Sequence, residues 1–174
     1  MQIDDRIIDF NLEGIDGSMY TLDSFMEKDI VIIIFYCNHC PYAQAYQDRM
    51  IQLQKDYEDD VNIIAINSND DSQYPEDSLD EMVKRSTTYR YNFAYLRDES
   101  QQAARKYQAV KTPHVFMFHK GKLVYKGAID DNWEKPKEVK KEFLRDAIEA
   151  IIAGEEIEVK ETSPIGCSIK WKSG

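Results

Sequence analysis

The chain has 174 residues, of which 43% are apolar and 31% charged, a balance typical of one soluble globular domain. Its formal charge of −10 argues against a nucleic-acid or anionic-membrane partner, because phosphate recognition needs clustered Lys and Arg. No apolar run approaches the ~20 residues of a membrane span, and acidic residues stand near Met1, where a secretory leader carries basic ones. We therefore expect one domain over residues 1–174, located in the cytoplasm.

The first third of the chain predicts a hairpin and then two buried strands on either side of a helix. Residues 7–22 read as two short strands around a Gly-Ile-Asp-Gly turn at 14–17. The runs at 30–35 and 61–66 are apolar and rich in β-branched residues, which is typical of strands covered on both faces of a sheet. Between them, apolar residues recur with a helical period over 41–57.

The rest of the chain predicts further helices and a second hairpin. The expected elements are a polar loop (67–77), a helix (78–89), a short extended segment (93–96), a helix (99–107), a hairpin (115–118 and 123–126), a long amphipathic helix from Pro136 to Gly154, and a C-terminal tail (155–174). Strands separated by helices imply a parallel core, and the second hairpin adds antiparallel strands. The predicted fold class is therefore α/β, with a central mixed sheet, helices on both faces and an N-terminal hairpin extension.

The sequence Cys37-Asn38-His39-Cys40 lies directly after the first buried strand and opens the following helix. A helix N-terminus favours a thiolate over a thiol, and the thiolate is the nucleophile in disulfide exchange. We predict that Cys37 is exposed at this helix end, has the lower pKa of the pair and attacks disulfides, while Cys40 resolves the mixed disulfide. A protonated His39 between the two sulfurs would stabilise the thiolate further.

The order strand–CxxC–helix, followed much later by Thr112-Pro113 ahead of a hairpin, resembles the thioredoxin fold. The stretch 8–25 and the segments at 95–100 and 112–116 are similar to the redoxin branch, which includes alkyl hydroperoxide reductase-like and thiol-specific antioxidant-like proteins. The ending Gly-Cys-Ser-Ile-Lys-Trp at 166–171 resembles a group of peroxiredoxin-like thioredoxin-family proteins. The resemblance implies a cis-proline at Pro113 that faces the cysteines, and a Thr112 backbone that pairs with an extended substrate strand.

The chain departs from both kinds of relative at positions that matter for chemistry. A peroxiredoxin carries the pattern P-x-x-x-T-x-x-C, whereas the corresponding positions before Cys37 are Ile30 and Ile34. The chain therefore lacks the hydroxyl that would hold a peroxide oxygen. Thioredoxin has a buried Asp six residues before its first cysteine, and Val31 stands there in this chain.

Three functions are compatible with these residues. The leading hypothesis is a thiol–disulfide oxidoreductase in which Cys37 and Cys40 act on protein or small-molecule disulfides, with a thiol or reductase as electron donor and no cofactor or catalytic metal. The second is a hydroperoxide reductase with a Cys37 sulfenic acid resolved by Cys40 or Cys167. The third is a zinc module with Cys37, His39 and Cys40 as ligands, to which Cys167 could be added.

Cys167 in the tail has two possible roles. It could be a third redox cysteine, which accepts the disulfide from the CxxC pair or receives electrons from a partner. It could equally be a small buried residue at the place where the tail docks. The sequence leaves both roles open.

Overall fold

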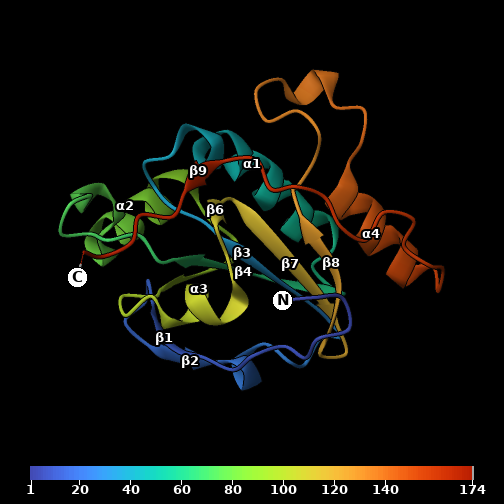
Figure 1. The fold of residues 1–174 in the computed structure, drawn as a ribbon, viewed down its shortest axis with the longest axis horizontal. Helices are drawn as coiled ribbons and strands as arrows, with labels where there is room; N and C mark the ends of the chain where they lie inside the picture. The colour runs from blue at the N-terminus through green and yellow to red at the C-terminus, as the bar shows by residue number, and fades with distance from the viewer. Residues whose placement is uncertain (174) are drawn as a thin grey trace.

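The computed structural model describes residues 1–173, and its centre is a seven-stranded mixed sheet (Figure 1). The strands run in the order β2-β1-β5-β4-β3-β7-β8. Their bounds are β1 Asn11–Gly14, β2 Met19–Thr21, β3 Ile30–Phe35, β4 Val61–Asn67, β5 Ala94–Arg97, β7 His114–His119 and β8 Lys122–Gly127. A separate two-stranded pair joins β6 (Lys111–Thr112) to β9 (Cys167–Ser168).

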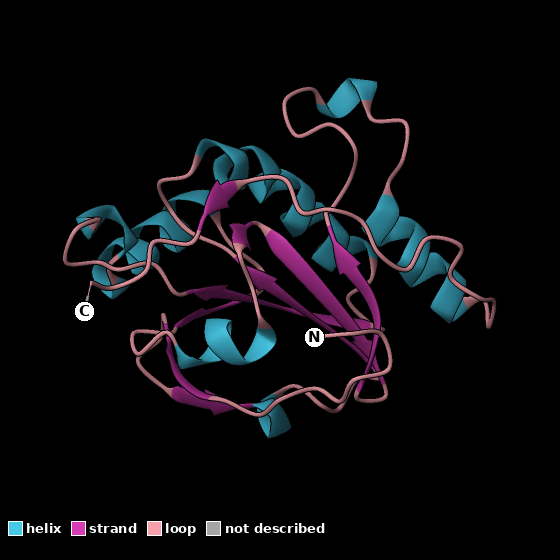
Figure 2. Ribbon diagram, in the orientation of Figure 1, coloured by secondary structure: helices cyan, strands magenta, loops and turns pink. Residues whose placement is uncertain are grey.

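Four α-helices and three short 3-10 turns surround the sheet (Figure 2). The helices are α1 Pro41–Asp56, α2 Leu79–Tyr89, α3 Gln102–Tyr107 and α4 Phe143–Ile152. The 3-10 turns are η1 Leu22–Ser24, η2 Pro75–Asp77 and η3 Pro136–Glu138. In the described chain no helix combines the length and the apolar character needed to cross a membrane.

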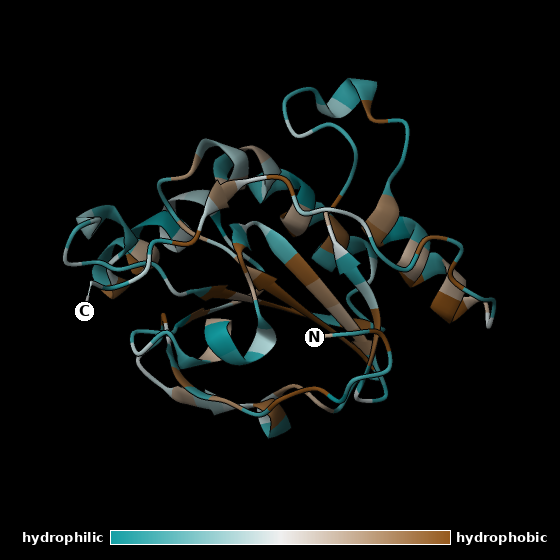
Figure 3. Ribbon diagram, in the orientation of Figure 1, coloured by the Kyte–Doolittle hydropathy of each residue, from teal (hydrophilic) through white to brown (hydrophobic). Residues whose placement is uncertain are grey.

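The strand β3 is the centre of the fold because it has a partner on each side and a core on each face. It pairs parallel with β4 and antiparallel with β7. Ile32 and Ile34 point into a core that also holds residues of α1, α2 and α4, while Ile33 and Phe35 point into a second core that includes α3. The strands are accordingly the most apolar part of the ribbon (Figure 3). The predicted mixed sheet with helices on both faces, and the thioredoxin-like fold class, are confirmed.

The N-terminal hairpin also forms as the sequence predicts, and β1 pairs antiparallel with both β2 and β5. The prediction of a long helix that begins at Pro136 is wrong for its first part. The chain makes only the turn η3 there, and α4 starts at Phe143. The reason is that Asp131 bonds to the backbone that a continuous helix would use. Its carboxylate accepts the N–H of Lys140 at 3.0 Å, and its own N–H donates to the carbonyl of Lys141 at 3.1 Å.

Candidate active site

The cysteine turn, residues 36–40, connects the carboxyl end of β3 to the start of α1. Tyr36 continues the extended chain beyond β3, because its N–H donates to the carbonyl of Ile66 at 2.8 Å. The helix then begins at Pro41, with Cys40 as its N-cap residue. The helix N-terminus, with its unpaired N–H groups, is therefore occupied by Cys40, and the prediction that Cys37 holds this position is wrong.

Cys37 is fully buried as part of the core between the sheet and α1, so the prediction of an exposed, acidic thiol is wrong as well. Burial raises the pKa of the Cys37 thiol to about 12, and the negative charge of Asp77 acts in the same direction. The Thr112 hydroxyl, whose Oγ1 lies 3.3 Å from the Cys37 sulfur, and the N–H groups of His39 and Cys40 oppose this rise without cancelling it. Cys37 is a protonated thiol in this arrangement.

Cys40 is joined by a disulfide bond to Cys167, and of the three cysteines only Cys37 remains a free thiol. The two bonded cysteines are 127 positions apart in the sequence, and their Cα atoms are 6.2 Å apart. Cys167 reaches this place because β9 pairs antiparallel with β6, which sets it directly opposite Thr112. The C-terminal tail is thus part of the site.

Thr112 brings all three cysteines together. The Thr112-Pro113 peptide bond is cis, as the resemblance implies. The Thr112 hydroxyl contacts the sulfur of Cys37, and the backbone carbonyl oxygen of Thr112 lies 3.5 Å from the sulfur of Cys40. The backbone edge expected to receive a substrate strand is paired with Cys167 of the chain itself.

Asp77, the last residue of η2, fixes the cysteine turn from the other side, and the sequence analysis did not identify it. The buried Asp77 carboxylate accepts the backbone N–H of Asn38 at 2.7 Å and the side-chain amides of Asn67 and Asn69 at 3.2 and 3.0 Å. It also contacts Nδ1 of His39. Only the tertiary fold brings η2 against the turn, so the polar loop at 67–77 carried no local signal of this role.

His39 lies between two partners that hold its ring in place. Its Nδ1 contacts Asp77, and its ring stacks on Tyr74 with centroids 5.1 Å apart and planes 10° apart. Cys37, His39 and Asp77 each place a possible metal-ligand atom within 4.8 Å of the others. The zinc module considered as an alternative has a different ligand set, which includes the Cys40 thiolate, whereas Cys40 is joined to Cys167 here.

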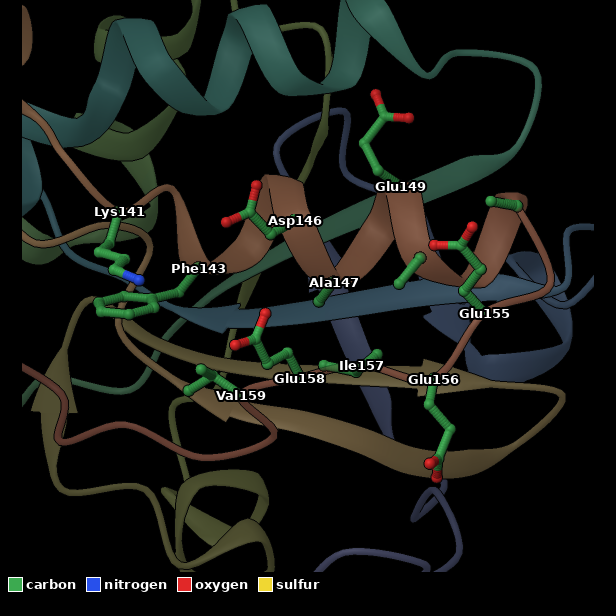
Figure 4. A pocket seen from close by; sticks show the side chains of 12 residues that line it. Lys141, Phe143, Asp146, Ala147, Glu149, Glu155, Glu156, Ile157, Glu158 and Val159 are labelled. Atoms are coloured by element: carbon green, nitrogen blue, oxygen red, sulfur yellow. The ribbon is translucent and has the colours of Figure 1, made fainter.

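A pocket elsewhere on the molecule has a volume of about 350 Å³ and lies between α4 and residues 155–159 (Figure 4). Its lining is rich in carboxylates, such as those of Asp146, Glu149 and Glu158. None of its lining residues belongs to the cysteine turn or to β6. The pocket is therefore separate from the site around Thr112.

The mixed sheet, the cysteine turn and the facing cis bond at Thr112-Pro113 place the protein in the thioredoxin-like class. A family model described as AhpC/TSA family matches residues 3–126, which is more than half of the sequence. The chain therefore belongs to the AhpC/TSA family. The matched range contains Cys37, Cys40 and Thr112 but ends before Cys167.

Two solved structures are similar over nearly the whole chain. A hypothetical protein from Sinorhizobium meliloti is 32% identical with a TM-score of 0.94, and the match covers 100% of this chain and 97% of that one. An uncharacterized conserved protein from Geobacillus kaustophilus is 37% identical with a TM-score of 0.93, covering 99% and 94%. The thioredoxin domain of a thiol-disulfide oxidoreductase from Bacteroides vulgatus, 14% identical with a TM-score of 0.62 over 72% and 88%, is similar in fold alone. No curated protein matches the sequence.

Proposed function

We propose that the protein is a thiol–disulfide oxidoreductase whose working couple is Cys37 and Cys40. One observation carries the proposal: an extended, cysteine-bearing strand lies along Thr112 and is bonded through its sulfur to Cys40, with the free thiol of Cys37 in the same site. This is the arrangement that a mixed disulfide needs just before it is resolved. The free thiol of Cys37 attacks the sulfur of Cys40, and the sulfur of Cys167 leaves it.

The arrangement supports a division of roles opposite to the one expected from the sequence. Cys40 is the helix N-cap residue, and the helix dipole there favours its thiolate once it is reduced. We therefore assign to Cys40 the attack on a substrate disulfide. Both cysteines are buried, but Cys37 lies outside the helix N-terminus and its thiol pKa is raised to about 12, so it is assigned the resolving step.

The reaction is balanced by two exchange steps and one reduction. The Cys40 thiolate attacks one sulfur of the substrate disulfide, which forms a mixed disulfide and releases the other substrate sulfur as a thiolate. Cys37 then loses its proton and attacks Cys40, so that a Cys37–Cys40 disulfide forms and the second substrate thiol is released. An external thiol donor supplies two electrons to restore both cysteines.

A trapping experiment tests the roles directly. In the full chain with Cys37→Ser and Cys167→Ser, Cys40 is the only cysteine, and we expect it to form a stable one-to-one adduct with a model disulfide such as oxidised glutathione. The matched variant with Cys40→Ser and Cys167→Ser leaves only the buried Cys37, and we expect at least about tenfold slower adduct formation because its thiolate is scarce at pH 7. Mass spectrometry of the intact proteins measures both rates.

Two outcomes would count against the proposal. Equal rates in the two variants, or faster trapping on Cys37, would remove the assigned roles and favour those expected from the sequence. Reduction of a model disulfide at the native rate by Cys37→Ser and by Cys40→Ser would remove the function itself.

A further inference from the structure

The docking segment, defined as residues 161–173, lies where the resemblance expects an external substrate strand. It follows α4 at the end of the chain and runs back across the molecule to bring β9 beside β6 (Figure 1). Cys167 is paired with Thr112, and the N–H of Ile169 donates to the carbonyl of Val110 at 3.2 Å. The segment therefore uses the same backbone edge that an incoming strand would need.

Gly166 is the point of closest approach between the docking segment and the site. A Cβ atom at this position would stand 2.2 Å from the carbonyl oxygen of Thr112, which is well inside a van der Waals contact. Only glycine fits while the segment is in place. A side chain at position 166 would push the segment off β6 and leave the three cysteines unchanged.

Hydrogen bonds along its length hold the docking segment in addition to the disulfide. Thr162 bonds to Lys126, Ala128 and Tyr125, and the N–H of Lys172 donates to Gln101 at 3.0 Å. Ile169 is the only residue in it whose side chain is buried. The carbonyl of Lys170 accepts the N–H of Asp70 at 2.8 Å and the side-chain amide of Gln101 at 2.9 Å, and its N–H donates to Asn69 at 2.9 Å. A segment held by hydrogen bonds, with one buried side chain, can open locally at a cost below that of global unfolding.

We propose that Cys167 is a third redox-active cysteine and that the docking segment is an internal substrate of the Cys37–Cys40 couple. The segment must leave the edge of Thr112 before an external cysteine-bearing strand can bind there. This inference rests on the proposed function, because it names the docking segment as a substrate of the same cysteine couple.

The internal exchange is balanced without an oxidant or a reductant. Cys37 loses its proton and its thiolate attacks the sulfur of Cys40. The Cys37–Cys40 bond forms, the Cys40–Cys167 bond breaks, and Cys167 leaves as a thiolate that takes up a proton. One disulfide is present before and after, so the step changes only its position and whether the docking segment is tethered.

The tether gives the docking segment an advantage over free substrates. A segment on a short flexible linker has an effective concentration in the millimolar range, so an external strand present at about 0.1 mM is outcompeted by roughly tenfold. Removal of the internal competitor should then raise the rate on an external strand by a similar factor.

The test measures how fast the full-length protein reduces a disulfide-bridged model peptide at about 0.1 mM, with dithiothreitol as donor. We expect Cys167→Ser and Gly166→Val each to react about tenfold faster than the wild type. Gly166→Val keeps all three cysteines, so it separates docking from the loss of a thiol. Ser168→Ala is the matched control, because Ser168 is an exposed neighbour in β9, and its rate should equal that of the wild type.

Hydrogen exchange at the amide of Ile169 measures separately whether the docking segment lies on β6. We expect this amide to be protected in oxidised wild-type protein and in Ser168→Ala, and to exchange about tenfold faster or more in Gly166→Val. Wild-type rates of peptide reduction in both Cys167→Ser and Gly166→Val would overturn the inference. The proposed function would survive that result as long as Cys40→Ser is inactive, so the two failures are distinguishable.

Discussion

The cysteine turn and the docking segment meet at one disulfide but are held in place in very different ways. Cys37 and Cys40 are both fully buried, and the turn is tied to the fold by Asp77. The docking segment contributes one buried side chain, Ile169, and its other residues are half-buried or exposed. The difference indicates that the buried turn keeps the exchanging sulfurs aligned, while the segment held mainly by hydrogen bonds can carry its sulfur away.

The family match covers residues 3–126 and therefore only one of these two regions. It contains the cysteine turn and Thr112 but stops before the docking segment. The family match thus covers the cysteine turn and its facing proline, whereas the two similar full-length structures cover the docking segment as well.

The largest expected effect comes from the sheet. Ile32→Ala removes a fully buried side chain from β3 and should lower the free energy of unfolding by about 2–5 kcal/mol. Ile169 lies in the second core with Ile33 and Phe35, but on a segment that can open locally, so Ile169→Ala should lower the free energy of global unfolding by less, about 2 kcal/mol. Urea denaturation followed by circular dichroism measures both. An equal loss in the two variants would mean that the docking segment does not open before the rest of the protein unfolds.

The second prediction concerns His114, the first residue of β7, which supports the edge used by the docking segment. Its Nδ1 accepts the N–H of Val110 at 3.2 Å, and burial lowers the pKa of His114 to about 4, with the charges of Lys126 and the Met1 amino group acting in the same direction. The unfolded chain binds this proton near pH 6.5, so the stability that the neutral ring provides is complete above pH 6.5 and is lost as the pH falls towards 4. The loss should be about 3 kcal/mol.

His114→Gln provides the control for this pH effect, since glutamine does not titrate. The difference in unfolding free energy between wild type and variant should shrink as the pH is lowered from 7 to 4. A difference that stays constant over this range would show that His114 is not held neutral by the fold.

The smallest expected effect comes from Asp77. Asp77→Asn keeps a side chain of the same shape but removes the charge that raises the pKa of Cys37, so this pKa should fall. Unfolding should cost about 1–3 kcal/mol less, because buried hydrogen bonds to the carboxylate are weakened. In the oxidised protein Cys37 is the free thiol, so its rate of alkylation by iodoacetamide as a function of pH measures the change. Glu76→Gln, the exposed neighbour, should leave the profile unchanged.

The fold could be predicted from the sequence because its central signals are local. The apolar runs of β3 and β4 and the period of α1 specify buried strands and a helix without reference to distant residues. The false start at Pro136 has a different origin, since a hydrogen bond from Lys140 to Asp131, in the loop before Pro136, holds this backbone in a non-helical conformation. Local patterns do not contain such competition.

The site could be predicted only in part for the same reason. The cysteine motif and the cis bond before Pro113 were identified, but the burial of Cys37 depends on where α1 begins and on what packs over the turn. The pairing of Cys40 with Cys167 spans 127 positions, and no local rule selects it. Asp77 was missed because its role exists only once η2 has folded against the turn.

The most direct test of the account is to map the disulfide of the wild-type protein in glutathione buffers of increasing oxidising strength. Free thiols are alkylated at low pH, and the bonded peptides are identified by mass spectrometry. The account predicts two species in exchange, Cys40–Cys167 and Cys37–Cys40, and predicts that Gly166→Val shifts the population towards Cys37–Cys40. A single Cys40–Cys167 species in both proteins at every potential, with Cys37 always free, would contradict it.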